Sequence, residues 1–144
     1  MSQPVTVRLA EPSAEALRFL ARKEHRSVSE VGGRLIEEGI RQNSFPYIEF
    51  RSFNGERHAC IKGSLQVWQA ILVAKEYNMD AEAVASHLCL KPEQVQSAVS
   101  YYQSYPAEID QALEENRIGE ERLRQMLPNL RVFTTPAQGK EQTA

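Results

Sequence analysis

The sequence predicts a mainly α-helical protein with a few short β-strands. Apolar residues recur at spacings of three and four along much of the 144-residue chain, which is the period of an amphipathic helix. Alternation of apolar and polar residues, the pattern of a half-buried strand, is confined to short runs. Two of these runs are separated by Asn54-Gly55, a typical hairpin turn. With 42% hydrophobic residues, the chain can form one domain or two small ones.

The first predicted element is a short strand, Val5–Leu9. Its odd-numbered residues are apolar and point one way, whereas Thr6 and Arg8 point the other. A single strand leaves its backbone donors and acceptors unpaired. The same strand of a second copy would supply the missing hydrogen-bonding partners, so this segment predicts a homodimer.

Two amphipathic helices are predicted next. The first covers about 13–25, and the second begins at a capping box, Ser27–Glu30, and runs to about residue 42. Gly32 and Gly33 lie inside the second helix, where each glycine costs about 0.5–1 kcal/mol relative to alanine. Either they allow close helix packing across the dimer, or the helix begins later.

This order of elements over residues 4–43 resembles the ribbon-helix-helix family, which includes the Arc and MetJ repressors and many antitoxins. The similarity lies in four stretches: Val5–Leu9, Glu15–Leu20, Ser27–Glu30 and Arg34–Ile40. It implies a dimer whose paired strands lie in the major groove of DNA.

The resemblance also implies which residues contact DNA. Thr6 and Arg8 match the outward positions of the strand, and a bidentate contact of Arg8 with guanine is worth about 1–3 kcal/mol of discrimination. Ser27, Val28 and Ser29 match the start of the second helix, where free N–H groups favour a phosphate. The alternative is a small dimerisation module that binds no DNA.

The charge is low for a DNA-binding protein. The net charge is −2, and residues 1–44 hold seven Lys/Arg against six Asp/Glu. The net charge is −1 over residues 45–105 and −2 over residues 106–144. We therefore expect a modest, salt-sensitive affinity for DNA that repeated sites or a partner would increase.

The middle of the chain predicts a hairpin and a helix. After a linker at 43–46, strands are expected at Tyr47–Arg51 and His58–Lys62, with a turn between them. A helix is expected from about Gln66 to Tyr77, with Trp68 widening its apolar stripe.

A helix-turn-helix is predicted after it. Asp80 caps Ala81–Leu88, Cys89–Lys91 forms the turn, and Pro92 opens a helix that ends near residue 105. The exposed positions of this last helix carry no Lys or Arg, and the nearest basic residue is Lys91 in the turn. A packing or interaction unit is therefore favoured over a DNA recognition helix.

Residues 47–116 resemble a second family, the small winged-helix domain of previously unknown function found in some VapB-type antitoxins. The similarity lies in His58–Gly63, Val67–Ile71, Met79–Val84, Leu90–Val95 and Ala98–Tyr102. Family members usually carry a Gly-Thr-Arg-Ile/Val-Pro-Val stretch after the second strand. Lys62–Val67 stands there instead, without the arginine and proline.

The C-terminal segment predicts a partner-binding arm. Asp110–Arg117 has the composition of a surface helix end, and Glu120–Leu127 predicts a short helix with an apolar face. A helix of about ten residues is marginal in water, so it either docks on its own domain or orders on a partner. Arg131–Thr135 is a potential strand that can join the sheet edge of a partner, and 136–144 is expected to be disordered.

The second resemblance implies the partner. VapB-type antitoxins wrap such a tail around a PIN-type ribonuclease, and a basic side chain often reaches its metal-binding carboxylates. Arg124 or Arg131 is the candidate here, and Arg117 or Arg122 can substitute. The predicted partner-binding residues are Leu123, Arg124, Met126, Leu127, Leu130, Arg131 and Phe133.

No catalytic or metal-binding set is recognisable in the sequence. The three histidines are scattered, and the two cysteines form neither a metal motif nor a disulfide framework. His58 and Cys60 share one face of a strand and could in principle act as a base and its nucleophile. The favoured interpretation is a half-buried histidine beside a buried thiol with no catalytic role. We expect a non-enzyme without cofactor or metal.

The two resemblances together imply the antitoxin of a type II toxin–antitoxin system that also represses its own operator, whereas periodicity alone predicts a dimer with a binding arm. Three parts are expected: 1–44 for dimerisation and DNA binding, 45–116 as a winged-helix-like domain, and 117–144 as the C-terminal arm. Without an apolar span or a signal-peptide pattern, a cytoplasmic location with no membrane contact is expected. The alternatives are a stand-alone dimeric repressor without a toxin and an assembly adaptor without a DNA role.

Overall fold

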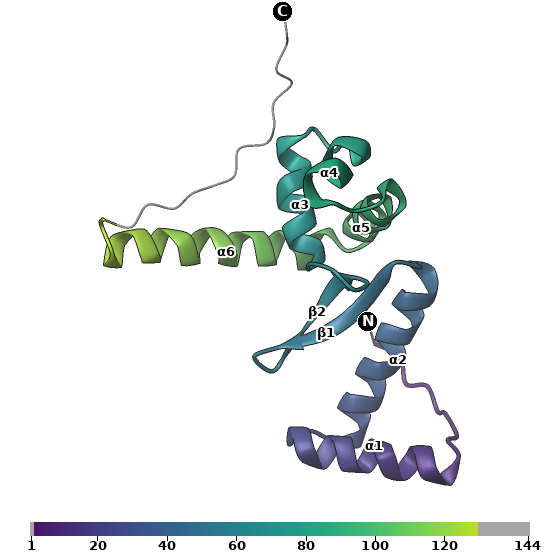
Figure 1. Cartoon of the computed structure of the whole chain (residues 1–144). Coiled ribbons are helices and arrows are strands. Elements are labelled where there is room, and N and C mark those ends of the chain that lie inside the picture. Colours follow the sequence, from purple (N-terminus) through teal and green to yellow (C-terminus); the bar gives the residue numbers. More distant parts are fainter. Residues whose placement is uncertain (1, 130–144) are drawn as a thin grey trace, which may run out of the picture. The chain divides into compact units, whose positions relative to one another are not determined.

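A computed structural model describes residues 2–129 of the chain (Figure 1). These residues form six helices and one two-stranded antiparallel sheet, so the prediction of a mainly helical fold with short strands is confirmed. The chain divides into two compact units, Met1–Arg41 and Gln42–Ala144.

The first unit contains helix α1 (Glu11–Glu24) and most of helix α2 (Val28–Ser44). Residues 2–10 belong to no helix or strand, so the strand expected at Val5–Leu9 is not formed in the single chain. A strand is held by backbone hydrogen bonds to a neighbouring strand, and no other strand lies among the described residues of this unit. The ribbon of two chains stays a prediction.

The turn between α1 and α2 follows the sequence signals closely. The Ser27 Oγ accepts a hydrogen bond from the N–H of Glu30 at 3.1 Å, as the Ser-x-x-Glu spacing predicts. The Arg34 guanidinium of α2 donates two hydrogen bonds to the Glu24 carboxylate of α1, at 2.6 and 3.2 Å. This bidentate pair raises the pKa of Arg34 and joins the two helices.

Gly32 of α2 lies against Leu17 of α1. A Cβ atom at position 32 would lie 3.5 Å from Cδ2 of Leu17, an ordinary van der Waals distance, so the packing of α1 on α2 does not require glycine there. Helix α2 begins at Val28, and the idea that it starts later is therefore wrong. No atom lies within 4 Å of the corresponding position at Gly33.

The second unit begins with the predicted hairpin. Strands β1 (Ile48–Phe53) and β2 (Glu56–Ile61) pair antiparallel, with Phe53 opposite Glu56. Asn54 and Gly55 form the two-residue turn with φ angles of 52° and 82°. Positive φ at both positions is what this turn requires, so the Asn-Gly signal is confirmed.

Three helices follow: α3 (Val67–Glu76), α4 (Ala81–Leu88) and α5 (Pro92–Ser104). Asp80 caps α4, because its side chain accepts hydrogen bonds from the N–H groups of residues 82 and 83. Cys89 ends α4 in the left-handed conformation, and Pro92 opens α5. The predicted helix-turn-helix is thus formed, with its turn at the expected residues.

Helix α6 (Pro106–Met126) runs unbroken through the point where the sequence suggested a helix end near Arg117 and a new helix at Glu120. That expectation was wrong. The Arg117 guanidinium bonds to Glu114 at 2.7 Å and to Glu121 at 3.0 Å, and these pairs join the two halves.

The core of the second unit lies between the hairpin and helices α3, α5 and α6. Tyr101 is fully buried there and meets Phe45 edge-to-face, with ring centroids 5.3 Å apart. The buried members of this core are Ile48, Ala59, Ile61, Val67, Ala70, Ile71, Ala98, Tyr101 and Ile109. The first half of α6 is therefore anchored in the domain by Ile109.

Candidate interaction surfaces

The first unit leaves most of its large apolar side chains exposed in the single chain. Ala21 and Val31 are its buried hydrophobic residues, whereas the side chain of Val5 is 81% exposed. The exposed large hydrophobics of this unit are Val5, Val7, Leu9, Phe19, Val28, Leu35, Ile36 and Ile40. A unit of about 40 residues with so small a core lacks the burial that independent folding requires.

The predicted DNA contacts lie on this unit, on two different segments. Thr6 and Arg8 are exposed on the extended residues that precede α1. Ser27 caps the start of α2, and Val28 and Ser29 occupy its first turn, all three exposed. The first N–H groups of a helix have no partner inside it, so this end suits an anion.

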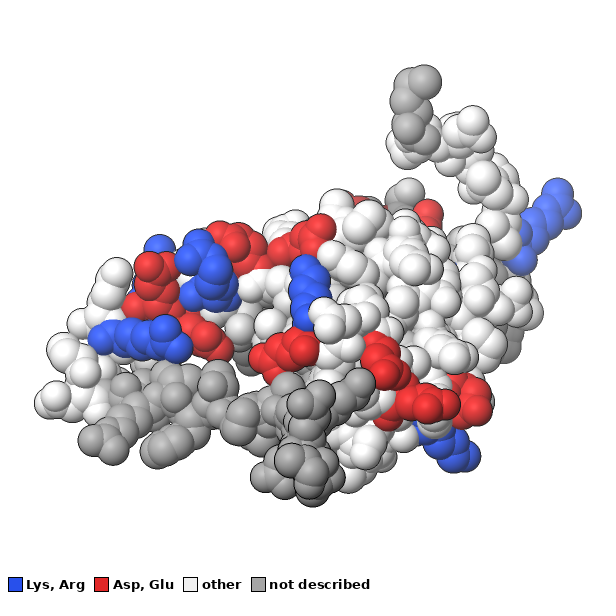
Figure 2. All heavy atoms as spheres, turned by 90° about the horizontal axis from the view of Figure 1, so that it is seen from above, with Lys and Arg blue, Asp and Glu red and all other residues white. Residues whose placement is uncertain are grey.

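The outer half of α6, residues 117–126, carries the predicted partner-binding face. Leu123, Met126 and the following Leu127 are exposed, Met126 at 77%, and Arg124 lies beside them. Figure 2 shows basic and acidic side chains interleaved over α6, at the left of the view. The remaining predicted contacts, Leu130, Arg131 and Phe133, lie outside the described residues.

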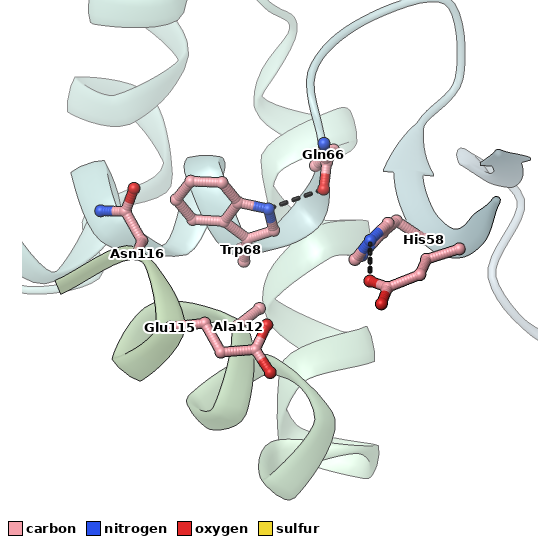
Figure 3. Close-up of a pocket in the computed structure, with 7 residues that line it drawn as sticks. His58, Gln66, Trp68, Ala112, Glu115 and Asn116 are labelled. Carbon is pink, nitrogen blue, oxygen red and sulfur yellow. Dashed lines mark hydrogen bonds and ion pairs between the residues drawn. The ribbon is translucent and has the colours of Figure 1, made fainter. Parts of the chain in front are cut away.

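A polar groove that the sequence did not predict lies between the hairpin and α6 (Figure 3). Its first part, of about 220 Å³, is lined by Glu56, His58, Gln66, Trp68, Ala112, Glu115 and Asn116. A neighbouring part of about 380 Å³ adds Arg57, Glu108 and Gln111. The one weak signal for this groove was Trp68, which the sequence pattern assigned to the widened apolar stripe of α3.

Side chains of both charges and one indole line this groove. The Trp68 Nε1–H donates to the Gln66 Oε1 at 2.7 Å, which fixes the ring along the groove. His58 Nε2 lies 3.5 Å from a Glu56 carboxylate oxygen. Glu108 and Glu115 lie on the α6 side and Arg57 on the hairpin side, and the Glu108 carboxylate accepts a hydrogen bond from the Tyr101 hydroxyl.

The Cys60 thiol contacts the backbone of His58. The Cys60 Sγ lies 3.5 Å from the backbone carbonyl oxygen of His58 and is fully buried. Burial raises the pKa of the Cys60 thiol, which lowers the fraction of reactive thiolate. Among residues 2–129 no three His, Cys, Asp or Glu side chains are grouped to hold a metal ion.

The exposed face of α5 matches the sequence pattern except at one position. Glu93, Gln96, Ser100 and Gln103 are exposed, Gln94 is half-buried, and Lys91 lies just before the helix. Ser97, which the spacing also placed on this face, is buried. Within the described part of the chain, no helix has the length and apolar character needed to cross a membrane.

The chain was compared with protein families, curated proteins and solved structures, and none of the three comparisons found a match. The two family resemblances therefore stay predictions from the sequence.

Proposed function

We propose that this chain is the antitoxin of a type II toxin–antitoxin pair. Two copies pair through the first unit and bind operator DNA, and the outer half of α6 binds and neutralises a PIN-type ribonuclease. The observation that carries the proposal is the apolar surface that one chain leaves uncovered in the first unit and again beyond Asn116.

Pairing of two copies accounts for the uncovered surface of the first unit. Removal of apolar surface from water stabilises by about 25 cal/mol per Å². Two Val5–Leu9 segments paired antiparallel would satisfy each other's backbone groups and direct their apolar side chains toward the two α1–α2 pairs. Thr6 and Arg8 would then lie together on the opposite face.

That opposite face supports the DNA-binding part of the proposal. A two-stranded ribbon fits the major groove, where arginine reads guanine and the start of α2 at Ser27 meets a phosphate. Because residues 1–44 carry a net charge of only +1, the affinity should depend strongly on salt and on neighbouring dimers.

The outer half of α6 supports the ribonuclease-binding part. Leu123, Met126 and Leu127 offer an apolar strip, and Arg124 offers a fork of donors that suits a carboxylate cluster. The resemblance of residues 47–116 to VapB-type antitoxins supports a ribonuclease as the owner of that cluster.

The test uses two baits, the full chain and a chain that ends at Asn116, in extracts of the native host. We expect mass spectrometry to identify a PIN-type ribonuclease with the full chain only. Cleavage of a single-stranded RNA by that ribonuclease should be inhibited by the full chain. If neither bait captures such a ribonuclease, the proposal fails and the stand-alone repressor becomes the better hypothesis.

Two single variants then locate the contact. Arg124→Ala should weaken inhibition of the captured ribonuclease, whereas Gln125→Ala, the neighbouring exposed position, should leave it unchanged. Equal inhibition by both variants would assign the contact to another arginine.

A further inference from the structure

A line of small and apolar residues on α6 leads from the groove to the end of the helix. Ala112, Gly119 and Met126 are seven residues apart, and a spacing of seven returns to nearly the same side of a helix. Leu123, four positions beyond Gly119, lies beside this line. Ala112 lines the groove, whereas the other three residues are exposed. We call these four residues the α6 strip.

The outer residues of the α6 strip have no cover among residues 2–129. The side chain of Leu123 is 43% exposed and that of Met126 is 77% exposed. Apart from the helix backbone, no described atom lies within 4 Å of a Cβ placed on Gly119. At its inner end the strip meets the groove, where the half-buried ring of Trp68 lies (Figure 3). An apolar segment along the strip would therefore end against an aromatic ring.

The chain turns where the α6 strip ends. Helix α6 ends at Met126, because the next residue precedes Pro128, and a residue before proline disfavours the helical conformation. Pro128 and Asn129 form a turn. Residues 130–135, which we call the tail segment, lie outside the described part of the chain and read Leu-Arg-Val-Phe-Thr-Thr. The large apolar residues of the tail segment are Leu130, Val132 and Phe133, and no further one follows in the sequence.

We propose that the tail segment lies antiparallel along the α6 strip of its own chain and places the ring of Phe133 against Trp68. In an extended segment, Leu130 and Val132 point to one side and Phe133 to the other. The first two then contact the α6 strip, and Phe133 meets the indole that α3 supplies to the groove. Two aromatic rings pack favourably edge-to-face or offset.

The reach of the tail segment matches the distance to Trp68. Asn116, which lines the groove with Trp68, lies about 15 Å along the axis from Met126 at about 1.5 Å per residue. Phe133 lies four residues beyond Asn129, about 13 Å in an extended chain at about 3.3 Å per residue. The aromatic side chain spans the remainder. The apolar residues of the tail segment therefore stop where the strip meets the groove.

The covalent connection to α6 is the reason for choosing this occupant. Residues 127–129 alone separate the α6 strip from the tail segment. A segment held by so short a connection has an effective concentration in the millimolar range. A separate protein at micromolar concentration would need a contact about a thousandfold tighter to occupy the same strip.

The docked tail segment has a consequence for regulation that rests on the proposed function. Met126 of the α6 strip and Phe133 of the tail segment both belong to the predicted ribonuclease contact. Neither is accessible to a ribonuclease while the segment is docked, so the ribonuclease would have to displace it. The docking itself depends on neither DNA nor ribonuclease.

The test is disulfide cross-linking within the full chain, in a background with Cys89→Ser that retains the buried Cys60. Asn116→Cys is combined with Thr134→Cys, because residue 134 lies about 16 Å beyond Asn129 in an extended chain, level with residue 116. The matched control combines Gln125→Cys with Thr134→Cys. The control positions are nine residues apart, whereas the test positions are eighteen apart.

The two rates distinguish a docked segment from an undocked one. An undocked segment closes the shorter loop faster, because loop-closure entropy grows with length. With the segment docked, we expect the bridge between positions 116 and 134 to form about tenfold faster than the control bridge. Equal rates, or a faster control bridge, would overturn the proposal.

A mixture of two single variants tests whether the tail segment belongs to the same chain. Chains with Asn116→Cys alone are mixed with chains that carry Thr134→Cys alone. We expect a covalent dimer to form at least about tenfold more slowly than the bridge within one chain. A covalent dimer that forms equally fast would assign the occupant to a second copy and overturn the proposal.

Fluorescence provides an independent measurement, because Trp68 is the only tryptophan of the chain. Phe133→Ala should increase quenching of Trp68 by acrylamide about twofold, since the covering ring is lost. Gln138→Ala, beyond the apolar residues, should leave the quenching unchanged. Equal quenching in Phe133→Ala and the unaltered chain would overturn the contact. Neither ribonuclease nor DNA is present in these measurements, so their outcome is independent of the test of the proposed function.

Discussion

Ile71 in α3 and Ile36 in α2 have the same side chain on the same kind of element, yet Ile71 is fully buried and Ile36 is 48% exposed. The contrast extends to the units that contain them. Gln42–Ala144 closes a core around Ile71 and Tyr101, whereas Met1–Arg41 buries little more than Ala21 and Val31. The second unit therefore completes its core within one chain, whereas the first unit leaves most of its large apolar side chains exposed.

The largest expected effect concerns the complete core. Ile71→Ala should lower the free energy of unfolding of the second unit by about 2–5 kcal/mol, because it leaves a cavity in a closed core. Leu72→Ala on the same helix, at a half-exposed position, should cost less than about 1 kcal/mol. Urea denaturation followed by Trp68 fluorescence measures both. Similar losses would contradict a closed core around Ile71.

The next effect separates the two candidate DNA-binding regions. Arg8→Ala should reduce discrimination between the operator and a scrambled duplex by about 1–3 kcal/mol, because a base contact is lost. Lys91→Ala, which removes one positive charge at the start of α5, should leave discrimination unchanged. Fluorescence anisotropy with a duplex selected from a random library measures both. The reverse outcome would move DNA recognition to the helix-turn-helix.

A third effect tests whether the first unit depends on a second chain. In the full chain, unfolding of the first unit should depend on protein concentration. A tenfold dilution should lower its stability by about 1.4 kcal/mol, whereas the second unit should not change. Hydrogen exchange at two concentrations resolves the units. Independence of the first unit from concentration would exclude the dimer.

The smallest expected effect is the pH dependence of the outer half of α6. The hydrogen bonds from Arg117 lower the pKa of Glu114 below its usual value of 4.5, so this carboxylate stabilises the folded helix above that value. The contribution is lost as the pH falls through the lowered pKa. Because the side chain of Glu114 is 55% exposed and solvent screens its pair with Arg117, the loss of helical signal at 222 nm should be slight. Arg117→Gln should abolish this loss of helical signal. An equal loss in the variant would show that the pair of Arg117 and Glu114 is not responsible.

Local signals in the sequence predicted local structure well. Asn54-Gly55 sets a two-residue hairpin, Asp80 caps α4 with its own side chain, and Ser27 does the same for α2. Each of these depends on residues within three positions of one another, where steric and hydrogen-bonding preferences act directly.

Features that depend on residues distant in sequence were missed. The groove joins Trp68 of α3 and His58 of β2 to Ala112 of α6, a juxtaposition that no local pattern encodes. The continuity of α6 was missed because the prediction used only the spacing of apolar residues. It did not consider the ion pairs that Arg117 makes with Glu114 in the preceding turn and Glu121 in the following turn. The strand predicted at Val5–Leu9 would need a second strand to pair with, and the single chain offers none among the described residues of its unit.

The continuity of α6 also makes it a rigid spacer with a defined rotational phase. Its 21 residues span about 32 Å at about 1.5 Å per residue, and Ile109 fixes its first turns in the domain. A protein that binds Leu123 and Met126 would therefore be held at a fixed distance from the hairpin and at a fixed angle around the helix axis. Insertion of one residue beside Gly119 would rotate the surface formed by Leu123 and Met126 by about 100° around the helix axis. Insertion of four residues would nearly restore its direction.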